Sequence, residues 1–577
     1  MTHMRGAQAL VQALANQGVE YVFGVPGHGD TNILDALYDS PIEFKLVRHE
    51  QAAAHIADGY ARVAGKPGVC CASVGPGAAN MIMGVAVAAH ASSPVVALSG
   101  GALRSMLGRG QLQETTRPET PTDDCFLQAV QPFVKRAWTI QDPLLIPEVV
   151  RRAFQIAQAG RPGPVWIEVP WDIQATYYEF PSAAAVTAEA SGRARADAQA
   201  VRAAAEKLAG AQCPVIVAGY GAVLSGAGPQ LLELAELLGA PIATSFPAKG
   251  VVPEEHPLSV GMIGWLGHPV AHELLREHAD YVLAVGIRFS DLSTSWWTEG
   301  LPFVKQNRFI QLDIDPVELG KNYPVEVGLV GDAKATLQDL ITACREVGAC
   351  DHRSRTCELV RRLKDGFRLE LPGGPSLEPL RVAAELRELL PAESILALDT
   401  GNHAHYFAAF YPIYAGGKLL NPGGWTPMGF GPAAILGAKL ARPDLPCICV
   451  TGDGGFFMSC QEVITAVEWG VPVVWIVFNN KSLGAIRDGQ IYDFKERIIG
   501  TEFTEQADFA QLARAFKAEG ITVREYSELA PALAHALNCG KPCVIDLILE
   551  RDAVPPPVAG SWYEPERGIP CPKPRSV

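Results

Sequence analysis

The chain has 577 residues, a formal net charge of −14 and 48 % hydrophobic residues, which is typical of a globular protein with several cores and excludes a disordered chain. The acidic balance leaves no basic face for a phosphate backbone, so nucleic acid is not an expected partner. The first residues resemble no secretion signal, and polar residues and a proline interrupt the most apolar stretch, 81–101, which argues against a membrane span. We expect a cytoplasmic protein that acts on small molecules.

Short apolar runs recur between helical patterns along the whole chain. Their lack of alternation is typical of strands that are covered on both faces, as in the parallel sheets of βαβ units. The predicted fold class is therefore α/β, with three doubly wound parallel-sheet domains. In chain order, the predicted strands are 21–25, 69–73, 95–99, 165–168, 215–218, 281–285, 309–314, 395–399, 447–451, 473–478 and 543–547.

Two stretches without this rhythm divide the chain. Residues 175–200 are small and polar, and residues 351–376 are charged and end in a Pro-Gly-Gly-Pro run. They are predicted to be linkers. The resulting domains are 1–180, 190–345 and 375–550.

A proline-rich tail, 551–577, follows the third domain. It contains Pro555, Pro556 and Pro557 and then Trp562 and Tyr563, which favours an extended segment with aromatic side chains that can dock on a surface. Two interpretations stay open, a lid over an active site or a solvated terminus.

Polar side chains follow two predicted strands of the third domain. Asp453 lies among glycines after the strand 447–451, and Asn480 follows the strand 473–478. Because the carboxyl ends of parallel strands meet at one edge of a sheet, both side chains are expected there. Either motif alone is typical of an ordinary turn. Together they indicate a site where oxygen ligands hold Mg²⁺ and backbone amides bind a diphosphate.

This pattern resembles the thiamine-diphosphate motif, in which Gly-Asp-Gly is followed by Asn-Asn about two dozen residues later. The resemblance implies that Asp453 and Asn480 hold the metal through their side chains and that Ser482 holds it through its carbonyl group. It also implies that the amides of Gly454 and Gly455 bind the diphosphate of the cofactor.

Thiamine enzymes also need a carboxylate that hydrogen-bonds the pyrimidine ring of the cofactor, so that the ring takes up the proton from the reactive thiazolium carbon. Glu50 is the candidate, because it ends a short strand and enters an Ala-rich helix. Without the metal motif, it would be read as an ordinary helix-start glutamate.

Several runs in the first domain resemble the acetolactate synthases. They are Gly24-Val25-Pro26-Gly27, Arg48-His49-Glu50-Gln51 and Gly75-Pro76-Gly77-Ala78-Ala79-Asn80. The resemblance implies that the Gly27 amide faces the oxyanion that develops on the substrate and that Gln113 lies near the substrate. His28 is either a proton-transfer group or an exposed turn residue.

A third group of cofactor contacts is implied for the last domain. Met428 resembles the apolar wedge between the two rings of thiamine, and the Thr426 carbonyl the acceptor for its amino group. A buried methionine is more often a core residue. Asn402 and His403 match the turn that binds the diphosphate.

The middle domain resembles the flavin-binding domain of acetolactate synthases, through Gly219-Tyr220-Gly221, Arg288, Asp313 and Asp332. FAD, ADP or no ligand are the open alternatives, because a Gly-x-Gly turn is weak evidence. The resemblance makes the three domains pyrimidine-binding, middle and diphosphate-binding.

The predicted function is a 2-oxo acid decarboxylating carboligase of the acetolactate-synthase type. The alternatives are a 2-hydroxyacyl-CoA lyase, an oxalyl-CoA decarboxylase or another 2-oxo acid decarboxylase, and more remotely a cofactor-binding protein without turnover. Gly489 stands where the synthases place a pocket tryptophan, which would enlarge the acceptor site and weakens the case for 2-oxobutyrate as the acceptor. The resemblance also implies a homodimer or homotetramer with active sites at the dimer interface.

Overall fold

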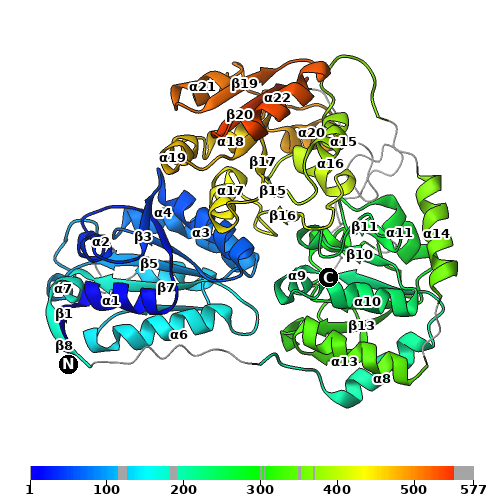
Figure 1. Cartoon of the computed structure of the whole chain (residues 1–577), viewed down its shortest axis with the longest axis horizontal. Helices are drawn as coiled ribbons and strands as arrows, with labels where there is room; N and C mark the ends of the chain where they lie inside the picture. The colour runs from blue at the N-terminus through cyan, green and yellow to red at the C-terminus, as the bar shows by residue number, and fades with distance from the viewer. Residues whose placement is uncertain are drawn as a thin grey trace.

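The computed structural model describes residues 2–114, 126–181, 192–298, 302–304, 306–348, 352–367 and 371–551. The predicted tail and its aromatic residues lie outside the described residues, apart from residue 551 at its start. The described chain forms three α/β units, each built on one six-stranded sheet in which all pairings are parallel (Figure 1). The predicted fold class is confirmed.

The first sheet has the strand order β3-β2-β4-β5-β7-β6. Its strands are β2 (Tyr21–Val25), β3 (Glu43–Leu46), β4 (Gly68–Ala72), β5 (Val95–Gly101), β6 (Arg136–Thr139) and β7 (Val165–Pro170). Its helices are α1 (Gly6–Asn16), α2 (Thr31–Tyr38), α3 (Glu50–Ala64), α4 (Pro76–His90), α5 (Phe126–Val130), α6 (Ile146–Gln158) and α7 (Trp171–Ala175). A separate antiparallel pair, β1 (Thr2–Arg5) with β8 (Tyr177–Phe180), joins the start of this unit to its end.

The middle sheet has the order β11-β10-β9-β12-β13-β14, which reads 3-2-1-4-5-6 when its strands are counted from its own start. This is the order of dinucleotide-binding folds. The strands are β9 (Pro214–Ala218), β10 (Ile242–Thr244), β11 (Ser259–Met262), β12 (Tyr281–Val285), β13 (Arg308–Asp313) and β14 (Val325–Val330). The helices are α8 (Ala198–Ala209), α9 (Tyr220–Ser225), α10 (Gly228–Leu238), α11 (Pro269–Glu277), α12 (Asp291–Thr294) and α13 (Ala333–Glu346).

One further helix, α14 (Arg353–Gly366), lies in the segment that the sequence predicts to be a linker. Its Val360 and Leu363 are buried in the core of the middle unit. The charged residues of this segment therefore form the solvent face of an amphipathic helix, and the middle unit continues past residue 345.

The third sheet has the order β16-β15-β17-β18-β20-β19. Counted from its own start, this order is 2-1-3-4-6-5, the same as in the first sheet. The strands are β15 (Ile395–Leu398), β16 (Lys418–Leu420), β17 (Cys447–Gly452), β18 (Val474–Asn479), β19 (Glu519–Val523) and β20 (Cys543–Ile548). The helices are α15 (Pro379–Leu389), α16 (His403–Phe410), α17 (Phe430–Ala441), α18 (Asp453–Phe457), α19 (Glu462–Trp469), α20 (Gly484–Phe494), α21 (Phe509–Ala515) and α22 (Tyr526–Asn538).

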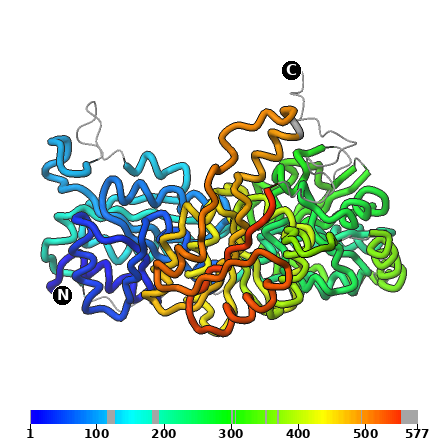
Figure 2. The backbone as a smooth tube through the Cα atoms, turned by 90° about the horizontal axis from the view of Figure 1, so that it is seen from above, coloured from blue at the N-terminus to red at the C-terminus, as the bar shows by residue number. Residues whose placement is uncertain are grey.

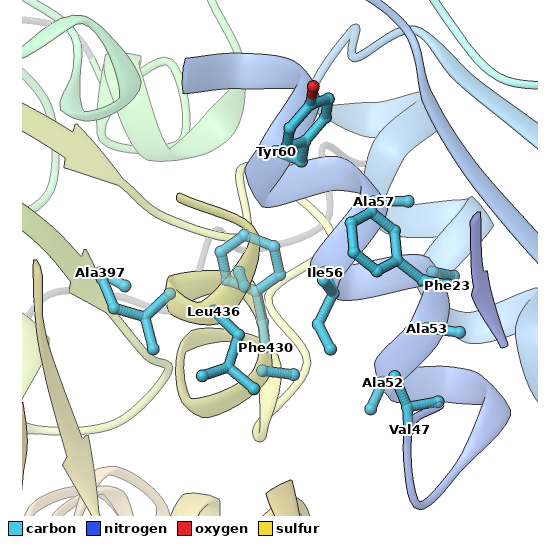
Figure 3. Packing of buried hydrophobic residues seen from close by; sticks show 14 of the residues in the cluster. Phe23, Val47, Ala52, Ala53, Ile56, Ala57, Tyr60, Ala397, Phe430 and Leu436 are labelled. Atoms are coloured by element: carbon cyan, nitrogen blue, oxygen red, sulfur yellow. The ribbon is translucent and has the colours of Figure 1, made fainter. Parts of the chain in front are cut away.

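Helices α3 and α17 join the first and third units (Figure 3). Ile56 of α3 packs in one buried cluster with Phe430 and Leu436 of α17. The backbones approach so closely that a Cβ on Gly59 would lie 2.1 Å from the Ala434 carbonyl oxygen, and a Cβ on Gly437 would lie 2.0 Å from the Ile56 carbonyl oxygen. Only glycine fits at these two positions, so the α3–α17 contact is rigid.

The three units adjoin one another, with the third unit between the other two when the chain is seen from above (Figure 2). Among the described residues, no helix combines the length and the apolar character that crossing a membrane requires. The cysteines in the described ranges are free thiols, and Cys70 and Cys71 are both buried in β4.

Candidate active site

The residues predicted to hold a metal lie at the carboxyl edge of the third sheet. Asp453 begins α18 directly after β17, and Asn480 and Ser482 follow the neighbouring strand β18. The Asp453 carboxylate accepts hydrogen bonds from the Gly454 amide, at 2.7 Å, and the Ser482 amide, at 3.3 Å. Burial raises the pKa of Asp453 to about 6, and a cation at this carboxylate would favour its charged form.

These side chains line a cavity of about 300 Å³ where the strand order of the third sheet reverses, between β15 and β17. Thr400, Asn402 and Met428 line it as well. The Thr400 hydroxyl and the Asn402 side-chain oxygen are buried without a hydrogen-bond partner in the described chain. Unpaired buried polar atoms are costly, so a polar ligand fits this cavity.

The glycines of the metal motif have no room for a side chain. A Cβ on Gly454 would lie 2.6 Å from a Leu483 methyl carbon and 4.0 Å from the Met428 sulfur, and a Cβ on Gly455 would lie 2.3 Å from the Asp399 carboxylate. The two glycines therefore let the motif pack closely against Leu483 and Asp399, and binding of a diphosphate by their amides stays a prediction. Among the described residues, no three His, Cys, Asp or Glu side chains gather as a metal cluster, so a metal at Asp453 would need ligands of other kinds, such as amide, carbonyl or phosphate oxygens.

The two residues of the predicted diphosphate turn differ in their contacts. The Asn402 side-chain amide donates to Asp488 of α20. His403 is buried, its Nε2 lies 2.9 Å from the Asp399 carbonyl oxygen, and burial lowers its pKa to about 3. Because a carbonyl oxygen only accepts, Nε2 carries the proton of the neutral ring. Thr426 is exposed and has a φ of 44°, which is unusual for a β-branched residue and matches a backbone shaped for a contact.

Glu50 lies at the carboxyl edge of the first sheet, as the first residue of α3. Its carboxylate accepts a hydrogen bond of 2.9 Å from the Asn80 side chain and lies against Gly77. The His49 ring caps the helix by accepting from the Gln51 amide. Glu50 is therefore held in a defined position at the start of a rigid helix.

The remaining residues predicted in the first unit surround this edge. A Cβ on Gly75, at the start of α4, would lie 2.4 Å from the Gln113 carbonyl oxygen, so the exposed Gln113 lies close to the Glu50 region. His28 is exposed. The Gly27 amide, which the sequence assigns to the substrate oxyanion, donates instead to the buried Asp30 carboxylate at 2.8 Å. An oxyanion role for this amide requires that the Asp30 contact be shared or broken, and it stays a prediction.

Glu50 is not among the described residues that line the cavity beside Asp453. Within one chain, the carboxylate and the metal-motif residues therefore belong to separate edges of separate sheets. The two groups of the predicted active site thus come from different units of the chain.

A larger cavity of about 660 Å³ lies at the corresponding edge of the middle sheet. Arg288, Asp313 and Asp332 all line it, as the sequence predicts. The turn after β9 touches the turn after β12, because a Cβ on Gly219 would lie 2.2 Å from the Gly286 carbonyl oxygen. Asp332 is already engaged by Arg193, at 2.7 Å, so it shapes the wall of the cavity through this ion pair.

Several residues at these sites are missed by sequence reasoning. Arg62 of α3 is buried at the wall of the middle cavity, paired with Asp58 and donating to the Asn421 carbonyl at 2.6 Å. Glu462 of α19 is fully buried and accepts from the Arg48 amide at 3.1 Å, two residues before Glu50. Arg62 ends the run Gly59-Tyr60-Ala61-Arg62, which resembles the acetolactate synthases, but the sequence assigns it no role. Glu462 stands in no such run, and its only sequence signal is a charged residue within an apolar helical pattern.

The fold defines an α/β protein of doubly wound parallel sheets, with cavities at the carboxyl edges of the middle and third sheets. Comparison with known families gives the family itself. Models of the thiamine pyrophosphate enzymes match three parts of the chain: the N-terminal TPP binding domain matches residues 4–120, the central domain 201–340 and the C-terminal TPP binding domain 399–547. The chain belongs to the thiamine pyrophosphate enzyme family.

Curated relatives cover nearly the whole chain. A probable acetolactate synthase large subunit from Methanococcus aeolicus is 36 % identical, over 96 % of this chain and 94 % of the relative. The acetolactate synthase large subunit of Haemophilus influenzae is 34 % identical, over 93 % of both chains. The acetolactate synthase isozyme 3 large subunit of Escherichia coli is 32 % identical, also over 93 % of both. The resemblance stated from the sequence motifs is confirmed.

Proposed function

We propose that this protein is a thiamine-diphosphate-dependent carboligase of the acetolactate-synthase type, which decarboxylates one 2-oxo acid and joins the remaining fragment to a second carbonyl compound. The observation that carries the proposal is the gathering of Asp453, Asn480 and Ser482 around one cavity with unpaired polar atoms. The full-length similarity to acetolactate synthase large subunits supports the same reaction class.

In this proposal, the Asp453 and Asn480 side chains and the Ser482 carbonyl hold Mg²⁺, and the Gly454 and Gly455 amides bind the diphosphate. Hard cations favour oxygen ligands, which this set provides. Thr400 adds a hydroxyl that can donate, since it has no partner in the described chain. Asn402 and His403 border the same cavity, and Met428 supports the bound cofactor as an apolar wedge.

When bound, thiamine diphosphate would supply an electron sink, which lets the carbonyl carbon of the 2-oxo acid lose CO₂ and then act as a nucleophile. Glu50 is proposed to hold a proton at the pyrimidine ring, with Asn80 orienting its carboxylate at 2.9 Å. Gln113 and His28 are proposed to face the substrate from the same edge.

We further propose that the active site forms between two subunits. Glu50 is not among the described residues around the Asp453 cavity of its own chain. A two-fold dimer would place the Glu50 edge of each subunit against the Asp453 edge of the other and so make two complete sites. A tetramer would be a pair of such dimers.

For the middle cavity we propose a nucleotide cofactor, FAD or ADP. Its volume of about 660 Å³ falls in the range of small-molecule sites, and its strand order is the dinucleotide-binding one. Arg288 offers a cationic side chain toward a phosphate. A cytoplasmic location is also proposed, and the free thiols of the described cysteines suit a reducing compartment.

The test is to incubate the purified protein with pyruvate, thiamine diphosphate and Mg²⁺ and to assay for acetolactate. Acetolactate formation supports the proposal. Acetaldehyde as the main product would indicate a 2-oxo acid decarboxylase, and turnover of acyl-CoA thioesters alone would indicate an acyl-CoA lyase or decarboxylase. A protein that binds the cofactor and turns over none of these substrates would favour the non-catalytic alternative.

A further inference from the structure

Asp399 is the buried carboxylate at which the segments of the proposed cofactor site meet. It follows β15 directly and is 1 % exposed. One carboxylate oxygen accepts from the Gly429 amide at 2.9 Å and from the Thr451 hydroxyl at 3.0 Å, and the other accepts from the Gly431 amide at 3.2 Å. All these partners are donors, so only an acceptor satisfies them.

These donors belong to two parts of the site. Gly429 ends the Met428 loop (residues 421–429) and Gly431 lies in the first turn of α17, whereas Thr451 lies in β17, two residues before Asp453. The same carboxylate lies against Gly455, whose added Cβ would come within 2.3 Å of it. The Asp399 carbonyl oxygen also contacts His403, at 2.9 Å.

The Met428 loop has no regular secondary structure of its own, so it needs ties from elsewhere. Gly429 has a φ of 87°, and both of its peptide groups are fixed, since its amide donates to Asp399 and its carbonyl accepts from the Ser459 hydroxyl at 2.8 Å. Met428 precedes this doubly fixed residue. Its position relative to the diphosphate segment therefore depends on the Asp399 and Ser459 contacts.

We propose that Asp399 is a positioning residue, which sets the Met428 wedge at the correct place relative to the diphosphate and metal segments. This inference rests on the proposed function, because it assigns Met428 and Asp453 to a thiamine diphosphate site. Asp399 touches no reacting atom and acts through the loops it joins.

The variant Asp399→Asn tests this role, because it keeps the size of the side chain and replaces one acceptor oxygen by a donor. The matched control is Asp280→Asn in the middle unit, where a half-buried carboxylate accepts from the Gln212 amide at 2.7 Å and the Cys213 amide at 3.0 Å, away from the cofactor segments. Both variants lose hydrogen bonds to backbone amides. Only the first loses them at the Met428 loop.

The readout is the rate at which the C2 proton of bound thiamine diphosphate exchanges with deuterium in the presence of Mg²⁺, followed by NMR after an acid quench. We expect Asp399→Asn to slow this exchange by about ten- to a hundredfold, because small misplacements of reacting groups have effects of that size. We expect the KM for pyruvate to change by less than about threefold, because Asp399 is buried and does not line the Asp453 cavity. Asp280→Asn should leave the exchange rate within about twofold of the wild type. An Asp399→Asn rate within the same twofold would overturn the inference.

If Asp399→Asn does not fold, Ser459→Ala carries the test, because it removes the second tie to Gly429. Slower exchange in Ser459→Ala supports the inference, and unchanged exchange overturns it. C2 exchange needs no 2-oxo acid, so its outcome is separate from that of the pyruvate assay. A wild-type protein that exchanges C2 but makes no acetolactate refutes the proposed reaction and leaves the inference standing, whereas a wild-type protein that binds no thiamine diphosphate overturns both.

Discussion

The cavity of the middle unit and the cavity of the third unit occupy the same place on their sheets, but they differ in how many units of the chain line them. Both lie where the strand order of a parallel sheet reverses. All three units of one chain contribute to the middle cavity, with Arg62 from the first, Arg288 from the middle and Asn421 from the third. The Asp453 cavity is lined by described residues of the third unit alone. The strand order thus determines where on the sheet a cavity forms. The packing of the neighbouring units determines whether one chain supplies all of its walls.

The largest expected effect is the loss of turnover on substitution of Glu50, which does not line the Asp453 cavity of its own chain. Glu50→Gln should lower turnover by about a hundredfold or more, because an amide cannot hold the proton that a general acid–base group transfers. Thiamine diphosphate and Mg²⁺ should still bind, since Asp453 is untouched, and calorimetry checks this. Turnover near the wild-type rate would show that Glu50 is not the acid–base group of the reaction.

Mixed dimers test the incompleteness of the Asp453 cavity directly. Glu50→Gln and Asp453→Asn chains, each inactive alone, should recover about a quarter of the wild-type activity when co-expressed in equal amounts, because half of the dimers are mixed and each carries one intact site. Each variant co-expressed with itself is the control. No recovery, with mixed dimers present by mass spectrometry, would place both residues in one chain's site.

Because one chain lines the middle cavity with all three of its units, a substitution there should affect only nucleotide binding, and by a smaller factor. Arg288→Ala should weaken nucleotide binding by about tenfold or more, the usual loss for a charge-assisted hydrogen bond. Nucleotide released from purified protein by heat and separated by chromatography gives the measurement. Arg345→Ala is the matched control, since Arg345 pairs with Glu233 at 2.8 Å on the surface of the same unit. Equal nucleotide content in both variants would exclude Arg288 from the site.

The last effect is on stability rather than on activity, and it concerns the contact between the two units that carry Glu50 and Asp453. Burial raises the pKa of Glu462 to about 7 from an ordinary value of 4.5. The folded protein therefore keeps this proton more tightly than the unfolded chain, so the stabilisation is present below pH 4.5 and is lost as the pH rises through 7. Glu462→Gln should remove a pH dependence of unfolding of about 3 kcal/mol at most.

Thermal unfolding of the cofactor-free protein between pH 5 and pH 8 measures this difference. Glu468→Gln is the control, because Glu468 lies on the same helix and pairs with Arg48 while staying exposed, and exposed pairs contribute little. If the wild type and Glu462→Gln show the same pH profile, the buried carboxyl does not couple the two units.

The amino-acid sequence predicts the central strands of each sheet, because strands such as β4, β9 and β18 are buried along their whole length and appear as apolar runs. Edge strands are less visible. β6 and β14 alternate or lie partly exposed, so their residues do not form such a run. The helix α14 is missed for a related reason, because its charged face dominates its composition.

In the candidate site, too, some residues are predictable from local sequence patterns and others are not. Asp453, Asn480 and Ser482 are predictable, because the βα turns of neighbouring strands bring them together at a fixed sequence spacing. The contact of Glu462 with the Arg48 amide joins positions far apart in the chain and depends on how two units pack. Such a contact has no local pattern, so one sequence alone does not reveal it.

Helix α3 has a consequence for how this chain can vary. Glu50 begins the helix at the proposed catalytic edge, and Arg62 lines the middle cavity near its end, so the two residues lie about 18 Å apart along the helix axis. Inserting or deleting one residue between them would turn one end relative to the other by about 100° and break the glycine contact with α17. The number of residues in the helix therefore sets both the distance and the relative orientation of Glu50 and Arg62. Positions other than Glu50, Gly59 and Arg62 can be exchanged without changing this spacing, whereas a change in the number of residues would alter it.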